Sequence, residues 1–161
     1  MTRALMTGRS VAQVVRQRAN DLKELTYTDD EILACINTAV RYLSLLLIQR
    51  RSPEMIEPVL VRDYMPMPEG FHSFVGENPV YAEGRVLRTY SGPDAEVPAR
   101  FFCTREALTD LSEEVPFPDD YRDVIVEGAV SVLKSTDEFD VSAETELMDR
   151  MGKMLPGEAS S

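Results

Sequence analysis

The hydrophobic pattern of residues 26–51 predicts a long helix that is buried on most of its circumference. Apolar side chains recur every three or four residues over 32–47, and two further apolar residues widen that stripe. Thr28 followed by Glu31 has the spacing of a capping box, and Pro53 stops the helix. A helix that is apolar nearly all round must be covered by other helices or by other subunits.

A second helix of the same character is predicted from Pro118 to Lys134. Proline suits the first helical position, and two aspartates follow it in the first turn, where the helix dipole favours acids. Gly128 and Ala129 lack bulk, so we expect a neighbouring helix to approach most closely there. The surplus apolar surface of both helices is expected to serve subunit contacts as well as the core.

The N-terminal region predicts a helix that starts at Ser10, with Gln13 completing a capping box. Its apolar positions run from Val11 to Leu22 at helical spacing, and Arg16 is expected to face water.

The C-terminal region predicts an amphipathic helix over 142–154, followed by a loose tail. Met148 and Met151 lie on its apolar side. Methionine stripes fill gaps in cores and also suit adaptable protein interfaces, and the pattern leaves both uses open.

The middle of the chain is of a different kind. Nine of the ten prolines fall between Pro53 and Pro118, which favours short strands and turns over helices. Strands are expected at residues 58–65, 80–90 and 97–104. Residues 91–96 are rich in turn formers and suggest a hairpin between the last two strands.

The segment 65–79 is expected to be a long loop with exposed aromatic side chains, Phe71 and Phe74. Loops of this length are often functional, so the two rings are candidates for docking a partner. They could equally pack back onto their own hairpin.

Together these elements predict a mainly α fold in a single domain of 161 residues. The expected core resembles a four-helix bundle, and a strand-rich insertion, a β-hairpin or small sheet, separates its second and third helices. The core would span 9–52 and 117–155, the insertion 53–116 and the loose tail 156–161.

The net charge of −11 is unevenly distributed. Residues 1–52 carry 8 basic and 5 acidic groups, whereas residues 53–118 and 119–161 are each strongly acidic. An acidic body repels phosphate and disfavours tight, sequence-independent DNA binding. Arg16 and Arg18 in the basic third could meet an acidic partner, or could simply belong to a solvated helix face.

No residue grouping predicts catalysis, a cofactor or a metal. The single histidine, His72, falls in the aromatic loop, and phosphate-binding glycine patterns are missing. Cys35 and Cys103 lack metal-ligand spacing and are expected to be buried free thiols. No apolar run approaches the roughly 18 residues that span a bilayer, and the N-terminus has no secretory signal. We therefore expect a protein that is not an enzyme and has no membrane partner.

Three features resemble the head-to-tail connector (adaptor) proteins of tailed bacteriophages. The first is DLKELTYTDDEILACINTAVRYL at 21–43, and the second is VPFPDDYRDVIVEGAVSVLKS at 115–135. The third is the strand-rich segment between them.

The resemblance implies a structural virion protein at the head–tail junction, assembled in the host cytoplasm. Such proteins form a homo-oligomeric ring, commonly dodecameric, beneath the portal protein. The ring extends the channel used in DNA packaging and ejection, lets DNA pass without specific binding, and docks the tail or the next connector. The family has no catalytic residues to carry over.

The candidate partner-interface residues are Arg16, Arg18, Phe71, Phe74, Met148 and Met151. A rival hypothesis is an acidic regulatory or DNA-mimic module that binds basic proteins. An enzyme would need a concave site that gathers acidic groups around His72.

Overall fold

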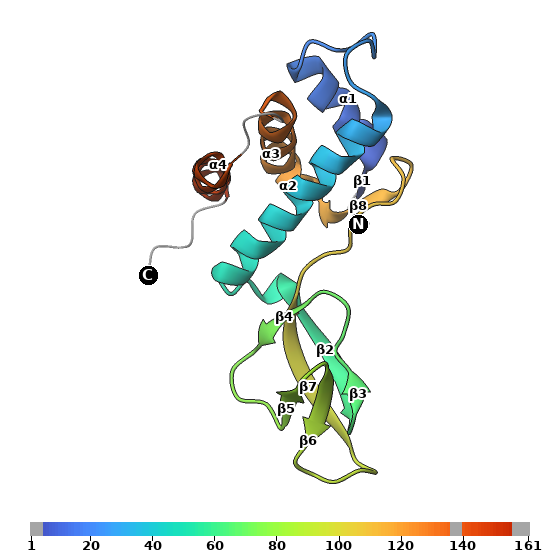
Figure 1. Cartoon of the computed structure of the whole chain (residues 1–161), viewed down its shortest axis with the longest axis vertical. Helices are drawn as coiled ribbons and strands as arrows, with labels where there is room; N and C mark the ends of the chain where they lie inside the picture. The colour runs from blue at the N-terminus through green and yellow to red at the C-terminus, as the bar shows by residue number, and fades with distance from the viewer. Residues whose placement is uncertain (1–4, 136–139, 156–161) are drawn as a thin grey trace. The chain divides into compact units, whose positions relative to one another are not determined.

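The computed structural model describes residues 5–135 and 140–155 and divides the chain into two compact units (Figure 1). The helical unit comprises the described residues up to Leu46 and from Glu106 onward, and the strand unit is Leu47–Arg105. Along the chain, the strand unit is thus inserted between two parts of the helical unit. The predicted tail, 156–161, lies outside the described residues.

The helices and strands alternate along the chain in the following order. The helical unit begins with β1 (Leu5–Thr7), α1 (Gly8–Arg18) and α2 (Asp29–Gln49), whose last turn enters the strand unit. The strand unit continues with η1 (Pro53–Met55), β2 (Ile56–Arg62), β3 (Met65–Pro66), β4 (Phe71–Phe74), β5 (Val80–Glu83), β6 (Val86–Thr89) and β7 (Glu96–Cys103). The helical unit resumes with β8 (Glu114–Pro118), η2 (Asp119–Tyr121), α3 (Arg122–Lys134) and α4 (Val141–Met154).

The prediction of a mainly α fold with a four-helix bundle-like core is wrong. The described residues combine four α-helices with three antiparallel sheets, ordered β1-β8, β2-β7-β4 and β3-β6-β5. One of these sheets lies inside the helical unit, where Leu5 of β1 pairs with Pro118 of β8. Proline is tolerated in a strand that has a free edge, so the prolines of 114–118 mark a strand end and not the first turn of a helix. The α-helix follows only at Arg122, after one 3₁₀ turn.

Helix α1 starts two residues earlier than predicted. Its cap is Thr7, whose Oγ1 accepts a hydrogen bond from the Ser10 backbone N–H at 3.1 Å. The first backbone donors of the helix are satisfied by the returning chain, since Gly8 N–H donates to the Glu113 carbonyl at 2.8 Å. The helix ends at Arg18, so Leu22 lies outside it and is exposed instead of continuing the core stripe.

Helix α2 begins as predicted. The Glu31 backbone N–H donates to Thr28 Oγ1 at 3.1 Å, and the Thr28 hydroxyl lies 3.3 Å from the Glu31 carboxylate. By length and composition alone, α2 could cross a membrane, because an 18-residue stretch of it has a mean hydropathy of 1.6. However, 61% of that stretch is buried within the protein. The core helix of a globular protein has the same properties.

Three residues of INTAVRYL, residues 36–43 within the first connector-like segment, join α2 to other elements of the helical unit. The Asn37 side chain donates to the Leu108 carbonyl at 2.8 Å and accepts from the Leu108 N–H at 2.7 Å. The Tyr42 hydroxyl donates to Glu144 of α4 at 3.0 Å. Ala39 lies fully buried against α3.

The close helix contact predicted at Gly128 is confirmed. A Cβ atom at this position would lie 2.9 Å from Ala39 Cβ and 3.1 Å from Met151 Sδ. Gly128 of α3 therefore admits both α2 and α4, and its missing side chain is what allows the three helices to share one core.

The strand unit corrects two expectations for the middle segment. Residues 80–90 form a hairpin by themselves, with β5 paired to β6, whereas β7 pairs with β2 and β4 in another sheet. The predicted hairpin across 91–96 is therefore wrong. The expected loop 65–79 contains β3 and β4.

Phe71 and Phe74 of β4 are half-buried instead of exposed. Their rings contact each other at 5.3 Å and lie 5.4 and 5.5 Å from the fully buried ring of Phe101. The core of this unit also includes Val61, Val80, Leu87, Ala99 and Cys103. The alternative in which the two rings pack onto their own sheet is the one observed.

We predict that Gly128→Val lowers the free energy of unfolding by about 2 kcal/mol. The new side chain would clash with the Cβ atom of Ala39, and because that atom is attached directly to the backbone, the helices themselves would have to move apart. Urea unfolding monitored by circular dichroism measures the change. The double variant Ala39→Gly/Gly128→Val should lose less than the sum of the single variants, since one partner in the clash is removed. Additive losses would contradict the proposed contact.

Candidate functional site

The described residues contain no cluster suited to metal binding: over 5–135 and 140–155, no three His, Cys, Asp or Glu side chains could hold an ion together. His72 is exposed, and its Nδ1 lies 2.9 Å from the hydroxyl of the adjacent Ser73.

Both thiols are buried, as expected, Cys35 in the helical unit and Cys103 in the strand unit. Burial, together with the charge of Glu31, raises the pKa of Cys35 to about 11. Burial also raises the pKa of Cys103, with the charge of Glu57 acting in the same direction. A thiol whose pKa is raised is a poor nucleophile at neutral pH.

The six predicted interface residues do not form one surface. Met151 is fully buried against Gly128, and Met148 is half-buried on the same helix. Arg18 is at the surface, with Nη1 3.7 Å from a carboxylate oxygen of Glu127 on α3. Phe71 and Phe74 belong to the core of the other unit, as described above. An interface role for any of these residues stays a prediction.

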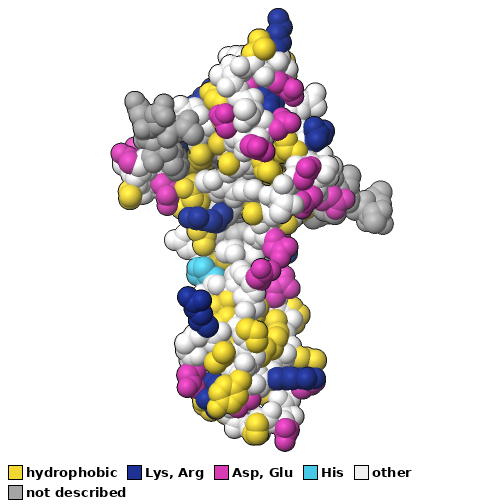
Figure 2. Space-filling view, turned by 45° about the vertical axis from the view of Figure 1, so that its right-hand side comes forward, with side chains coloured by type: hydrophobic (Ala, Val, Ile, Leu, Met, Phe, Trp, Pro, Cys, Tyr) yellow, Lys and Arg dark blue, Asp and Glu magenta, His cyan; other side chains and the backbone are white. Residues whose placement is uncertain are grey.

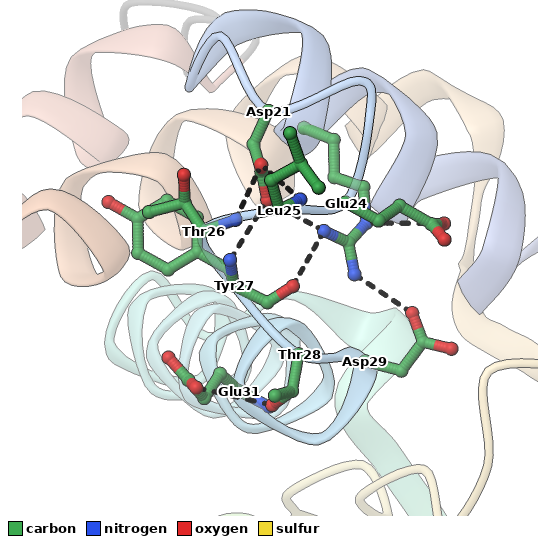
Figure 3. A network of polar contacts seen from close by, with 9 residues as sticks. Asp21, Glu24, Leu25, Thr26, Tyr27, Thr28, Asp29 and Glu31 are labelled. Atoms are coloured by element: carbon green, nitrogen blue, oxygen red, sulfur yellow. Dashed lines mark hydrogen bonds and ion pairs between the residues drawn. The ribbon is translucent and has the colours of Figure 1, made fainter.

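Arg16 departs most from its expected place. It is 5% exposed instead of facing water, and its guanidinium contacts the loop between α1 and α2. Nη1 donates to Asp21 Oδ2 at 2.8 Å and to the Tyr27 carbonyl at 2.9 Å, while Nη2 lies 2.9 Å from Asp29 Oδ1. One buried cation thus ties the end of α1 to the start of α2, through its acceptors in Asp21, Tyr27 and Asp29, which Figure 3 labels.

Asp21 is the acceptor on which the α1–α2 loop, residues 19–28, is organised. The carboxylate is 3% exposed and accepts backbone hydrogen bonds from Leu25, Thr26 and Tyr27 at 2.9, 2.9 and 3.0 Å. Burial raises the pKa of Asp21, but these three N–H groups and the charge of Arg16 outweigh burial, so its pKa lies below the ordinary range. The loop is therefore held by a charged carboxylate.

The backbone of this loop is constrained at two further points. Asn20 and Glu24 have φ values of 57° and 58°, in the left-handed region that non-glycine residues seldom adopt. The Glu24 N–H donates to the Asp21 carbonyl at 3.0 Å and closes a turn with Leu22 and Lys23 at its tip.

Two leucines project from the α1–α2 loop into solvent. Leu22 is 61% exposed and Leu25 is 83% exposed. Both side chains belong to a loop whose backbone is held by the Arg16–Asp21 ion pair, so they are presented to solvent by an ordered segment. We take the braced loop as the strongest candidate for an interaction surface among the described residues.

The strand unit carries a second apolar feature, a groove of about 490 Å³ lined by residues of β2, of β7 and of the 77–79 segment. Most of its lining is apolar, and the apolar residues are Pro58, Val59, Leu60, Pro79, Pro98 and Ala99. Its polar lining residues are Glu77, Asn78 and Arg100.

Comparisons with models of protein families and with curated proteins gave no match for this chain. The function must therefore be argued from the residues and their arrangement.

We predict that Asp21→Asn destabilises the protein at neutral pH and that this difference from the wild type disappears in acid. Because the folded pKa of Asp21 lies below the unfolded value of about 4, its stabilisation is complete above that pH and is lost as pH falls through the folded pKa. Urea unfolding of both proteins from neutral pH down to pH values below 4 measures this. Asp30→Asn, at an exposed aspartate of the same region, is the control. An undiminished difference in acid would contradict the assignment.

We also predict that iodoacetamide leaves both cysteines of the folded protein unmodified under mildly alkaline conditions that alkylate the urea-unfolded chain completely. Burial of Cys35 and Cys103 is the reason. Intact-mass spectrometry counts the added groups. Rapid modification of either thiol in the folded protein would show that its surroundings open readily.

Proposed function

We propose that this chain is a head-to-tail connector of a tailed bacteriophage, a structural protein of the virion and not an enzyme. In this proposal, copies of the chain form a ring, commonly of twelve, beneath the portal protein. The ring extends the DNA channel and provides the surface on which the tail or the next connector docks.

The observation that carries the proposal is the role of the residues in which the sequence resembles connectors. Asn37, Ala39 and Tyr42, all from INTAVRYL, hold α2 against the 106–111 segment, α3 and α4. These are constraints on one particular packing and not general features of any helical sequence. They support the proposal because the residues that carry the resemblance are the ones that hold this packing.

Residues 118–121, PDDY, in the second connector-like segment have a comparable role before the start of α3. Asp119 accepts from the Arg122 guanidinium at 2.7 Å, and the ring of Tyr121 packs on buried Phe117 at 5.6 Å. This joins β8 to the following helix and fixes the direction in which α3 enters the core.

The charge of the chain agrees with a channel protein. A net charge of −11 per copy would repel the DNA backbone, and repulsion lets DNA slide without adhering. On the face shown in Figure 2, acidic and basic side chains are interspersed.

The surplus apolar surface of α2 does not by itself supply the ring interface. Its central apolar residues are buried by the chain's own elements, with Ile32, Ile36 and Leu43 fully inaccessible. Contacts with other subunits must therefore use other surfaces than this core stripe.

We predict that the purified protein forms a large cyclic assembly once the portal is present. Native mass spectrometry of the chain alone, of the portal alone and of their mixture measures this. A portal ring carrying one connector copy per portal subunit is the expected result. A stable monomer that ignores the portal would contradict the proposal and favour an acidic module that binds other basic proteins.

A further inference from the structure

The α1–α2 loop has an ordered backbone but leaves two apolar side chains exposed to water. Its conformation is held by buried Arg16 and Asp21, with three backbone N–H groups bound to one carboxylate. Its apolar side chains, Leu22 and Leu25, gain nothing from that order, because both remain in water. Ordering a loop costs conformational entropy, which a binding partner would otherwise have to offset.

The charges around the two leucines indicate the chemistry of the partner. Glu24, Asp29, Asp30 and Glu31 are exposed on or beside the loop, and Lys23 is the exposed cation among them. The positive charge of Arg16 is already shared among the carboxylates of Asp21, Glu24 and Asp29. The rim is therefore acidic, and it complements an apolar pocket edged by lysine or arginine.

A second copy of this chain is a poor electrostatic match for that rim, because each copy carries a net charge of −11. Nucleic acids and anionic lipid surfaces are repelled for the same reason. The rim thus favours a basic surface on a different protein.

We propose that the loop is a preorganised docking tip that inserts Leu22 and Leu25 into an apolar, basic-rimmed pocket of a partner protein, which under the proposed function is the portal. This differs from the alternative in which Arg16 of the basic third meets an acidic partner. At the loop, Arg16 is buried, and the exposed charges are acidic apart from Lys23. The inference rests on the proposed function for the identity of the partner.

The test is binding of purified portal to the full-length chain and to matched leucine variants, measured by interferometry. Leu22→Ser and Leu25→Ser should each weaken portal binding roughly tenfold or more, as truncation of a central apolar anchor does. Val141→Ser is the matched control, because Val141 is 81% exposed, close to the 83% of Leu25, but is the first residue of α4 and not part of the loop. Thermal unfolding should be unchanged in all three variants, which separates a docking role from a structural one.

A second arm tests the charge of the rim. Asp30→Lys should weaken portal binding, and added salt should weaken binding of the wild type. Tighter binding by Asp30→Lys would show that the pocket is acidic and would overturn the proposal.

The remaining outcomes are separable. If the wild type binds and neither loop variant loses affinity, the docking tip is overturned and the connector function stands. An equal loss in Val141→Ser has the same meaning. Self-association that the loop variants abolish would make a second copy the occupant and overturn the choice of partner. Failure of the wild type to bind the portal overturns both proposals.

Discussion

A helix that is apolar on nearly every side has to be covered on nearly every side, and the helical unit is organised by that requirement. Gly128 removes the side chain that would keep α3 away from α2, and it admits Met151 of α4 to the same place. Asn37 adds the returning chain at Leu108 by pairing with both of its backbone groups. Once α2 is enclosed in this way, the rest of the unit has little freedom in how it packs.

The sequence predicted the elements of this core because their signals are local. Thr28 and Glu31 lie one helical turn apart, and their hydrogen bond depends on nothing outside that turn. Gly128 is recognisable in the sequence as a residue without a side chain in a largely apolar segment. Where the determinant is non-local, prediction failed: β1 and β8 pair residues more than a hundred positions apart, and neither is long or apolar enough to be recognised alone.

The candidate site shows the same division. The spacing of the apolar residues extended the first predicted helix to Leu22, and it placed Arg16 among the residues that face water. Its burial follows from the turn that brings Asp21 back beneath it, a turn that needs positive φ at Asn20 and Glu24. Leu22 did not reveal the loop, because its spacing fitted the apolar stripe of a helix that ends at Arg18 in the structure. In the strand unit, Phe71 and Phe74 were misplaced for a related reason, because their partner Phe101 is some thirty residues away in the chain.

The bond between Asn37 and Leu108 spans the whole strand unit, since every residue of that unit lies between these two positions. When the helical unit folds, it must bring together two chain segments that the strand unit separates, so the strand unit counts as a loop closed by this contact. The entropic cost of closing a loop rises only with the logarithm of its length, by about 0.6 kcal/mol for each doubling. An inserted unit of another size would therefore barely change the stability of the helices that enclose α2. The helical unit can remain constant while the insertion between its two parts is exchanged, lengthened or reduced.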